Sequence, residues 1–134
     1  MKRIKWLVLV IAPIMLTGCA NTLKCEIETQ NYEASIKIKF ENDKPTTYKS
    51  SETMHFNHLS TDAELYYHSQ YDTYSYLITD GYAKIHNRND EVTTKIDYDF
   101  SINESQGEDS LLISREDNQE TAKQKIESSS YTCK

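Results

Sequence analysis

The stretch that decides the fold is KCEIETQNYEASIKIKFENDKPTTYKSSETMHF, residues 24–56. At its centre, Ile36, Ile38 and Phe40 alternate with lysines. This two-residue period is typical of a strand with one buried face and one face in water. A similar alternation begins at Cys25 and continues through Ile27 and Thr29. The sequence therefore predicts two neighbouring strands in its first folded segment.

Turn residues separate these strands from each other and from a third strand. Gln30-Asn31 can turn the chain after the first strand, and the cluster ENDKP at 41–45 follows the second. The segment TTYKSSETMHF, residues 46–56, then predicts a third strand. Its larger apolar residues are Tyr48, Met54 and Phe56. We expect an antiparallel meander of three strands.

A helix is expected next, within residues 60–81. Thr61 and Glu64 fit a capping box, with Asp62 in the first turn. Gly81 fits the end of the helix. The expected apolar face comprises Ala63, Tyr67, Tyr71, Tyr74 and Ile78. A rival interpretation is a strand, because Tyr74, Tyr76 and Ile78 also alternate and Asp80-Gly81 is a strong hairpin turn. We favour a helix that ends early.

The remaining third of the chain predicts a hairpin and a second helix. Residues 82–102 form the hairpin, with its turn at Asn87–Asp90. One face of its second strand carries Val92, Thr94, Ile96, Tyr98 and Phe100. Residues 103–110 form a loop, and 115–130 a polar helix whose apolar face is little more than Ala122 and Ile126. The expected fold class is α+β: an antiparallel sheet, meander plus hairpin, with one long helix and a C-terminal helix packed on it.

The N-terminal 18 residues have the features of a lipoprotein signal peptide. Lys2, Arg3 and Lys5 form a positive region, and Trp6–Met15 is almost wholly apolar but too short to span a bilayer as a helix. LTGC at 16–19 then matches the bacterial lipobox. We expect cleavage before Cys19, rather than retention of an uncleaved anchor, and diacylglycerol on its thiol. The expected organisation is a signal peptide at 1–18, a lipidated tether at 19–24 and one domain at 25–134.

Charge and cysteine content limit the class of protein. The whole chain has a net charge of −6 and a mean hydropathy of −0.72. Removing residues 1–18 leaves 12 basic against 21 acidic residues, a net charge of −9, which argues against nucleic-acid binding and against a polybasic membrane patch. If Cys19 carries lipid, Cys25 and Cys133 remain. An even number of remaining cysteines in an exported chain predicts a disulfide between these two. Two free thiols are the alternative.

Candidate ligand-binding residues are few. His55, His58, His68 and His86 invite a metal site, but two of them at i, i+3 on a strand point to opposite faces, so we expect no metal and no cofactor. The chain has ten tyrosines, six of them between Tyr66 and Tyr82. Most are expected to pack against the sheet, and Tyr66 and Tyr76, off the predicted helix face, are the candidate ligand surface. No nucleotide-binding or nucleophile motif is present, so we expect no enzyme.

The lipobox, the segment 40–56 and the capped helix after it together resemble the YehR-like family of small bacterial lipoproteins. KSSETMHF at 49–56 carries the closest likeness, and the terminal SYTCK is similar to small lipoproteins of low-GC Gram-positive bacteria. The resemblance implies an α+β fold and a paired-cysteine variant with Cys25 and Cys133. It implies no activity, because the family has no established biochemical function.

These features together predict a lipoprotein on the extracytoplasmic face of a Gram-positive cell membrane. Its bilayer contact would be the diacylglycerol on Cys19. We expect a non-catalytic domain that binds an envelope protein or another envelope component. The alternatives are a receptor that binds a small ligand through its tyrosines and, less favoured, a divergent hydrolase with an acid and a histidine near His55 or His68.

Overall fold

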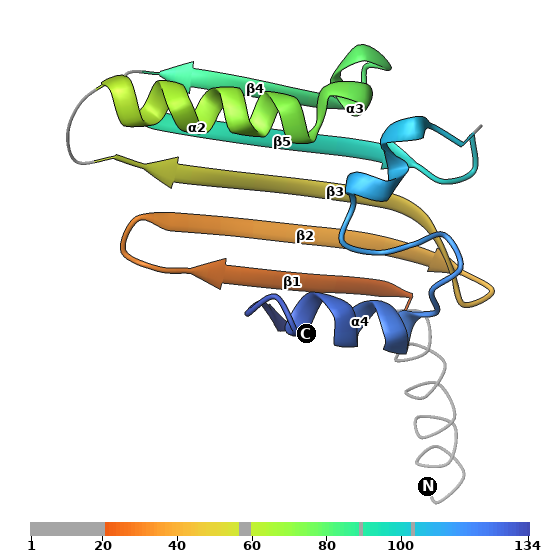
Figure 1. Cartoon of the computed structure of the whole chain (residues 1–134). Coiled ribbons are helices and arrows are strands. Elements are labelled where there is room, and N and C mark those ends of the chain that lie inside the picture. The colour runs from red at the N-terminus through yellow and green to blue at the C-terminus, as the bar shows by residue number, and fades with distance from the viewer. Residues whose placement is uncertain (1–20, 57–59, 89, 103) are drawn as a thin grey trace, which may run out of the picture.

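One six-stranded antiparallel sheet organises the structure (Figure 1). The computed structural model describes residues 21–56, 60–88, 90–102 and 104–134. The strand order is β4-β5-β3-β2-β1-β6. The strands are β1 (Thr22–Glu28), β2 (Tyr32–Glu41), β3 (Lys44–His55), β4 (Ala83–Arg88), β5 (Glu91–Asp99) and β6 (Thr132–Cys133). The helices are α2 (Ser60–Thr73), α3 (Ser75–Thr79), the 3-10 helix η1 (Gln106–Ser110) and α4 (Gln119–Glu127).

The meander β1-β2-β3 forms as the alternation predicts. Ile36 of β2 lies directly opposite Cys25 of β1 and Ser50 of β3, so these three side chains share one face. The turn between β2 and β3 is tighter than expected. Only Asn42 and Asp43 lie in it, both with positive φ, a conformation that Asn and Asp tolerate better than most residues. Lys44 and Pro45, which the sequence placed in the turn, therefore begin β3.

The predicted hairpin is also confirmed, and it extends the same sheet. β5 pairs with β3, placing Tyr98 opposite Tyr48, and β4 forms the outer edge. The five residues predicted for the inner face of this strand are all buried, namely Val92, Thr94, Ile96, Tyr98 and Phe100. The apolar side of the sheet is thus continuous from β1 to β5.

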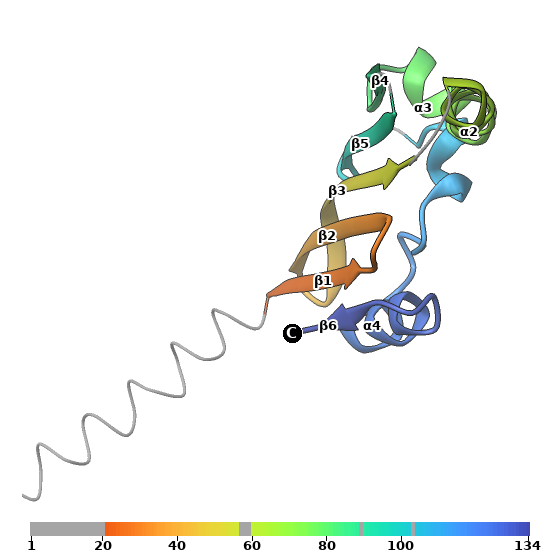
Figure 2. The same cartoon turned by 90° about the vertical axis from the view of Figure 1, so that its left-hand side faces the viewer.

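All the described helices cover one face of the sheet (Figure 2). Helices α2 and α3 pack on β4 and β5, and α4 packs on β1 and β6. The opposite face carries exposed side chains such as Lys37 and Lys95. The result is a two-layer α+β domain in which an antiparallel sheet has one dry and one wet face.

The single long helix expected after β3 is instead two helices. Tyr74 lies between the two helices, and its backbone angles, φ −108° and ψ 19°, are outside the helical range. The break lets Leu77 of α3 become fully buried, whereas Tyr71, predicted on the packed face, is 45% exposed. Gly81, with φ +85°, follows the end of α3 as expected. The expected cap at Thr61 involves a side chain outside the described residues.

The fold begins before Cys25, so the predicted tether is too long. Residues Thr22, Leu23 and Lys24 belong to β1, and Leu23 is only 2% exposed. The physical reason is that Leu23 continues the inward alternation of Cys25. The signal peptide and Cys19 lie outside the described residues.

The C-terminal helix is shorter than predicted. Helix α4 starts after Asn118, which forms a capping box with Thr121. Arg115 instead lies in a turn before the helix, and its side chain pairs with Glu108, which also accepts a hydrogen bond from the Tyr98 hydroxyl at 2.6 Å. The thin apolar face is confirmed: Ala122 and Ile126 are both fully buried. The predicted loop 103–110 contains η1.

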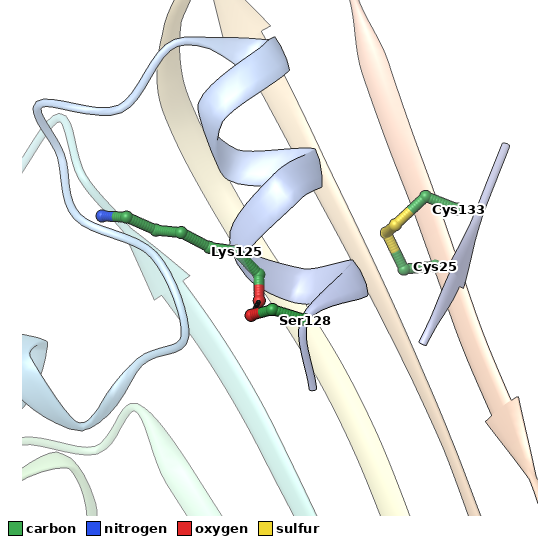
Figure 3. The surroundings of a disulfide bond; sticks show 4 residues. All are labelled: Cys25, Lys125, Ser128 and Cys133. Carbon is green, nitrogen blue, oxygen red and sulfur yellow. Dashed lines mark hydrogen bonds between the residues drawn. A yellow bond between two sulfur atoms is a disulfide. The ribbon is translucent and has the colours of Figure 1, made fainter. Parts of the chain in front are cut away.

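A disulfide joins the two ends of the domain (Figure 3). Cys25 lies directly opposite Cys133 in the β1–β6 ladder, and their sulfur atoms are bonded. β6, which the sequence did not predict, is the two-residue strand that follows α4 and carries Cys133. The bridge therefore holds α4 and β6 against β1.

We predict that replacing both cysteines, Cys25→Ala with Cys133→Ala, lowers the free energy of unfolding by about 4–5 kcal/mol, because the bridge spans 108 residues of chain. Urea unfolding of the oxidised protein and of the variant measures the difference. Thr132→Ser, at an exposed position beside the bridge, is the control and should change little. A loss below about 1 kcal/mol would contradict this role of the bridge.

We also predict that Gly107→Ala destabilises the domain by about 1–3 kcal/mol, because a Cβ there would lie 2.7 Å from the Leu77 Cγ atom. The matched control is Gly81→Ala, which meets open space and is strained only by its backbone, at about 1–2 kcal/mol. Leu77→Ala removes the Cγ contact but leaves the Leu77 backbone nitrogen 2.8 Å from that Cβ, so thermal unfolding of Gly107→Ala with and without Leu77→Ala isolates the side-chain part of the clash. The expected sign of a clash is that the two substitutions together cost less than the sum of their separate effects.

Candidate functional site

A small cavity lies on the dry side of the sheet, between the two groups of helices. Its volume is about 230 Å³. Strands β2 and β3 form its floor, while Tyr74, between α2 and α3, and residues from the segments before and after α4 form its walls. The lining includes four tyrosines and one carboxylate: Tyr32, Tyr48, Tyr74, Tyr131 and Glu52. We call this cavity the Glu52 pocket.

Glu52 is the only carboxylate among the residues that line the pocket. It lies on β3 opposite Ala34 and Thr94, so its side chain is on the inner face of the sheet. The Tyr32 hydroxyl donates a hydrogen bond to Oε2 of Glu52 at 2.5 Å, and Gln70 Nε2 donates to Oε1. A carboxylate has about four acceptor positions, so this one retains capacity for a further donor.

The tyrosine hydroxyls around Glu52 remain protonated to unusually high pH. Burial first, and the Glu52 carboxylate second, raise the pKa of Tyr66 to about 12. Burial and then Glu52 also raise the pKa of Tyr74 well above its ordinary value. For Tyr32 the order is burial, then its hydrogen bond to Glu52. The pocket is therefore lined by neutral hydroxyls and one acid at physiological pH.

The two tyrosines singled out from the sequence have different environments. Tyr66 is half-buried, packs on Phe56 with ring centroids 5.7 Å apart, and lies within the electrostatic influence of Glu52. Tyr76 is 57% exposed on α3 and does not line the pocket. The structure thus associates Tyr66 with the Glu52 pocket and leaves Tyr76 outside it.

Sequence reasoning missed most of the pocket. Tyr32 lies at the start of β2 and Tyr131 just before β6, so neither belongs to the tyrosine-rich segment 66–82. The sequence did contain a signal for Glu52. This residue is an even number of positions from Tyr48 and Met54, so it points to the same, inward face of the predicted third strand. A charged residue at an inward position is more informative than an exposed apolar one.

Within the described residues, which include His55, His68 and His86, no group of potential metal ligands forms around a histidine. His55 lies between Glu33 and Glu91, at 3.8 and 3.5 Å, and His68 lies 3.8 Å from Glu64 on the same helix. His58 is outside the described residues. In the part of the chain that the structure describes, no three potential metal ligands form a group.

Comparison of the chain with protein-family models, curated proteins and solved structures found no match. None of the helices in the described ranges is both long and apolar enough to cross a bilayer.

We predict that Glu52→Gln lowers the pKa of Tyr66 from about 12 toward its ordinary value near 10, because the substitution removes a negative charge that opposes tyrosinate formation. Nuclear magnetic resonance of ring-labelled tyrosine follows the titration. Glu64→Gln, on the same helix as Tyr66, is the control and should leave that pKa unchanged. An unchanged Tyr66 pKa in Glu52→Gln would show that Glu52 does not influence that side of the pocket.

Proposed function

We propose that this chain is a lipid-anchored protein of the cell envelope that binds a small cationic ligand in the Glu52 pocket, without catalysis. The observation that carries the proposal is the position of Glu52, a carboxylate on the inner face of the sheet surrounded by tyrosines. An acid at such a position costs stability unless its interactions compensate for it. A ligand that brings a positive charge would supply that compensation.

The lining supports an organic ammonium group in particular. Aromatic rings attract cations through their electron-rich faces, and a carboxylate adds a full opposite charge. Four of the thirteen residues that line the pocket are tyrosines. The net charge of −9 expected for the mature chain further favours the approach of cations over anions. The volume of about 230 Å³ suits a small ligand rather than a peptide.

The envelope location rests on the N-terminal sequence. The positive segment, the short apolar run and LTGC at 16–19 support cleavage before Cys19 and attachment of lipid there. The bonded Cys25 and Cys133 suit an oxidising compartment. The resemblance to YehR-like lipoproteins supports the same location, on the extracytoplasmic face of a Gram-positive membrane.

Titration calorimetry with choline tests the binding function. We expect wild-type protein to bind choline and Glu52→Gln to bind it at least tenfold more weakly, because the substitution removes the only carboxylate in the lining while keeping its shape. Glu116→Gln is the matched control, an exposed acid away from the pocket, and should bind as wild type.

A neutral molecule of similar size separates charge recognition from simple filling of the cavity. The neutral analogue 3,3-dimethylbutanol has the shape of choline without its charge, and we expect it to bind far more weakly. Equal binding of the two molecules, or equal choline binding by wild type and Glu52→Gln, would overturn the proposal. Mass spectrometry of the mature protein tests the anchor separately: a free thiol at Cys19 would contradict it.

A further inference from the structure

The wet face of the sheet carries a cluster of four lysines near the start of β1. Lys24 lies directly opposite Lys37 on β2, and Lys37 lies directly opposite Lys49 on β3. Lys39 is two residues from Lys37 on the same face of β2. All four side chains are exposed. We call this group, Lys24, Lys37, Lys39 and Lys49, the lysine cluster.

The arrangement places like charges side by side. Residues directly opposite in an antiparallel pair have Cβ atoms about 4.5–5.5 Å apart, so the three lysines of one cross-strand row repel one another. Within the described ranges, no carboxylate lies within 4.0 Å of the ammonium group of any cluster lysine. No close ion pair within the described ranges thus relieves this repulsion.

Acidic residues share this face but are distributed differently. Asp97 ends the cross-strand row, opposite Lys49, and Glu26 is in the next row. Farther along, Glu28 and Glu33 lie opposite each other.

Glu41, two residues after Lys39 on the same face of β2, and Asp99, opposite Thr47, also lie at the end of the sheet where β1 begins. The four lysines still outnumber Asp97, Asp99 and Glu41, so this is the more positive end, although the mature chain as a whole is expected to be strongly negative.

The cluster is also near the proposed anchor. Lys24 follows Cys19 by five residues, and extended chain spans at most about 3.6 Å per residue. The backbone of Lys24 therefore lies no more than about 18 Å from that of Cys19. Only Ala20 and Asn21 separate Cys19 from the first residue of β1.

We propose that the lysine cluster lies against the anionic headgroups of the bilayer and orients the anchored domain on it. Headgroup phosphates would compensate the repulsion within the cluster, and a short link to the lipid would keep the cluster close to them. This proposal rests on the lipid anchor proposed above. It revises the expectation from net charge that the chain has no basic patch for the membrane, because the fold gathers four lysines at one end of the sheet.

Amine labelling of the lipidated protein in vesicles tests the proposal. One set of vesicles is wholly phosphatidylcholine, and the other contains phosphatidylglycerol. At low salt, we expect the labelling rates of Lys24, Lys37 and Lys49 to be at least about threefold lower on the anionic vesicles than on the neutral ones. At high salt, the rates on the two kinds of vesicle should be equal. Lys123, exposed on α4 on the other side of the sheet, is the internal control and should be labelled equally on both.

A double variant, Lys37→Gln with Lys49→Gln, should remove the protection of Lys24, whereas Lys123→Gln should preserve it. Equal labelling of the cluster on both kinds of vesicle would overturn the proposal. The proposal would also be overturned if soluble poly(glycerol phosphate) slowed labelling of the cluster more than the anionic vesicles do, because the partner would then be an anionic polymer rather than the bilayer. Failure of the anchor is distinguishable, because unlipidated protein would not sediment with the neutral vesicles.

Discussion

Burial of one face of the sheet is the constraint on which the rest of the structure depends. Ile36, Ile38 and Tyr98 lie on that face and are almost completely shielded from water. Because side chains alternate along a strand, the same register that buries these residues sends the intervening lysines into solvent. The helices then have one surface to cover, and the disulfide between Cys25 and Cys133 holds the C-terminal end of the chain against it.

Glu52 is the exception within this buried face. Its neighbours on the same face of β3 are Ser50 and Met54, and its register partners are Ala34 and Thr94, so the surrounding side chains are neutral and Glu52 alone among them carries a charge. A charged residue at an inward position of a strand often serves function. Tyr32 and Gln70 compensate part of the cost by hydrogen bonding, and the tyrosine-lined cavity leaves room for a ligand to compensate more.

The predictable part of the fold is the part with strong two-residue alternation. The meander and the hairpin follow from it, because a shift of one residue would expose Ile36 or Ile96. The break at Tyr74 was not predictable with the same rules. It depends on burial of Leu77 beneath Gly107, a contact between segments 30 residues apart in the sequence. The start of β1 at Thr22 was not predicted, because residues 22–24 were assigned to the lipidated tether and not to the sheet.

The candidate pocket was less predictable than the fold. Tyrosine content pointed to residues 66–82, yet Tyr32, Tyr48 and Tyr131 come from segments that only the sheet brings together. The most direct test of the account is nuclear Overhauser spectroscopy with tetramethylammonium. The account predicts contacts from the ligand methyl protons to the rings of Tyr48, Tyr74 and Tyr131. Contacts confined to exposed rings such as Tyr76, with none to the pocket tyrosines, would contradict it.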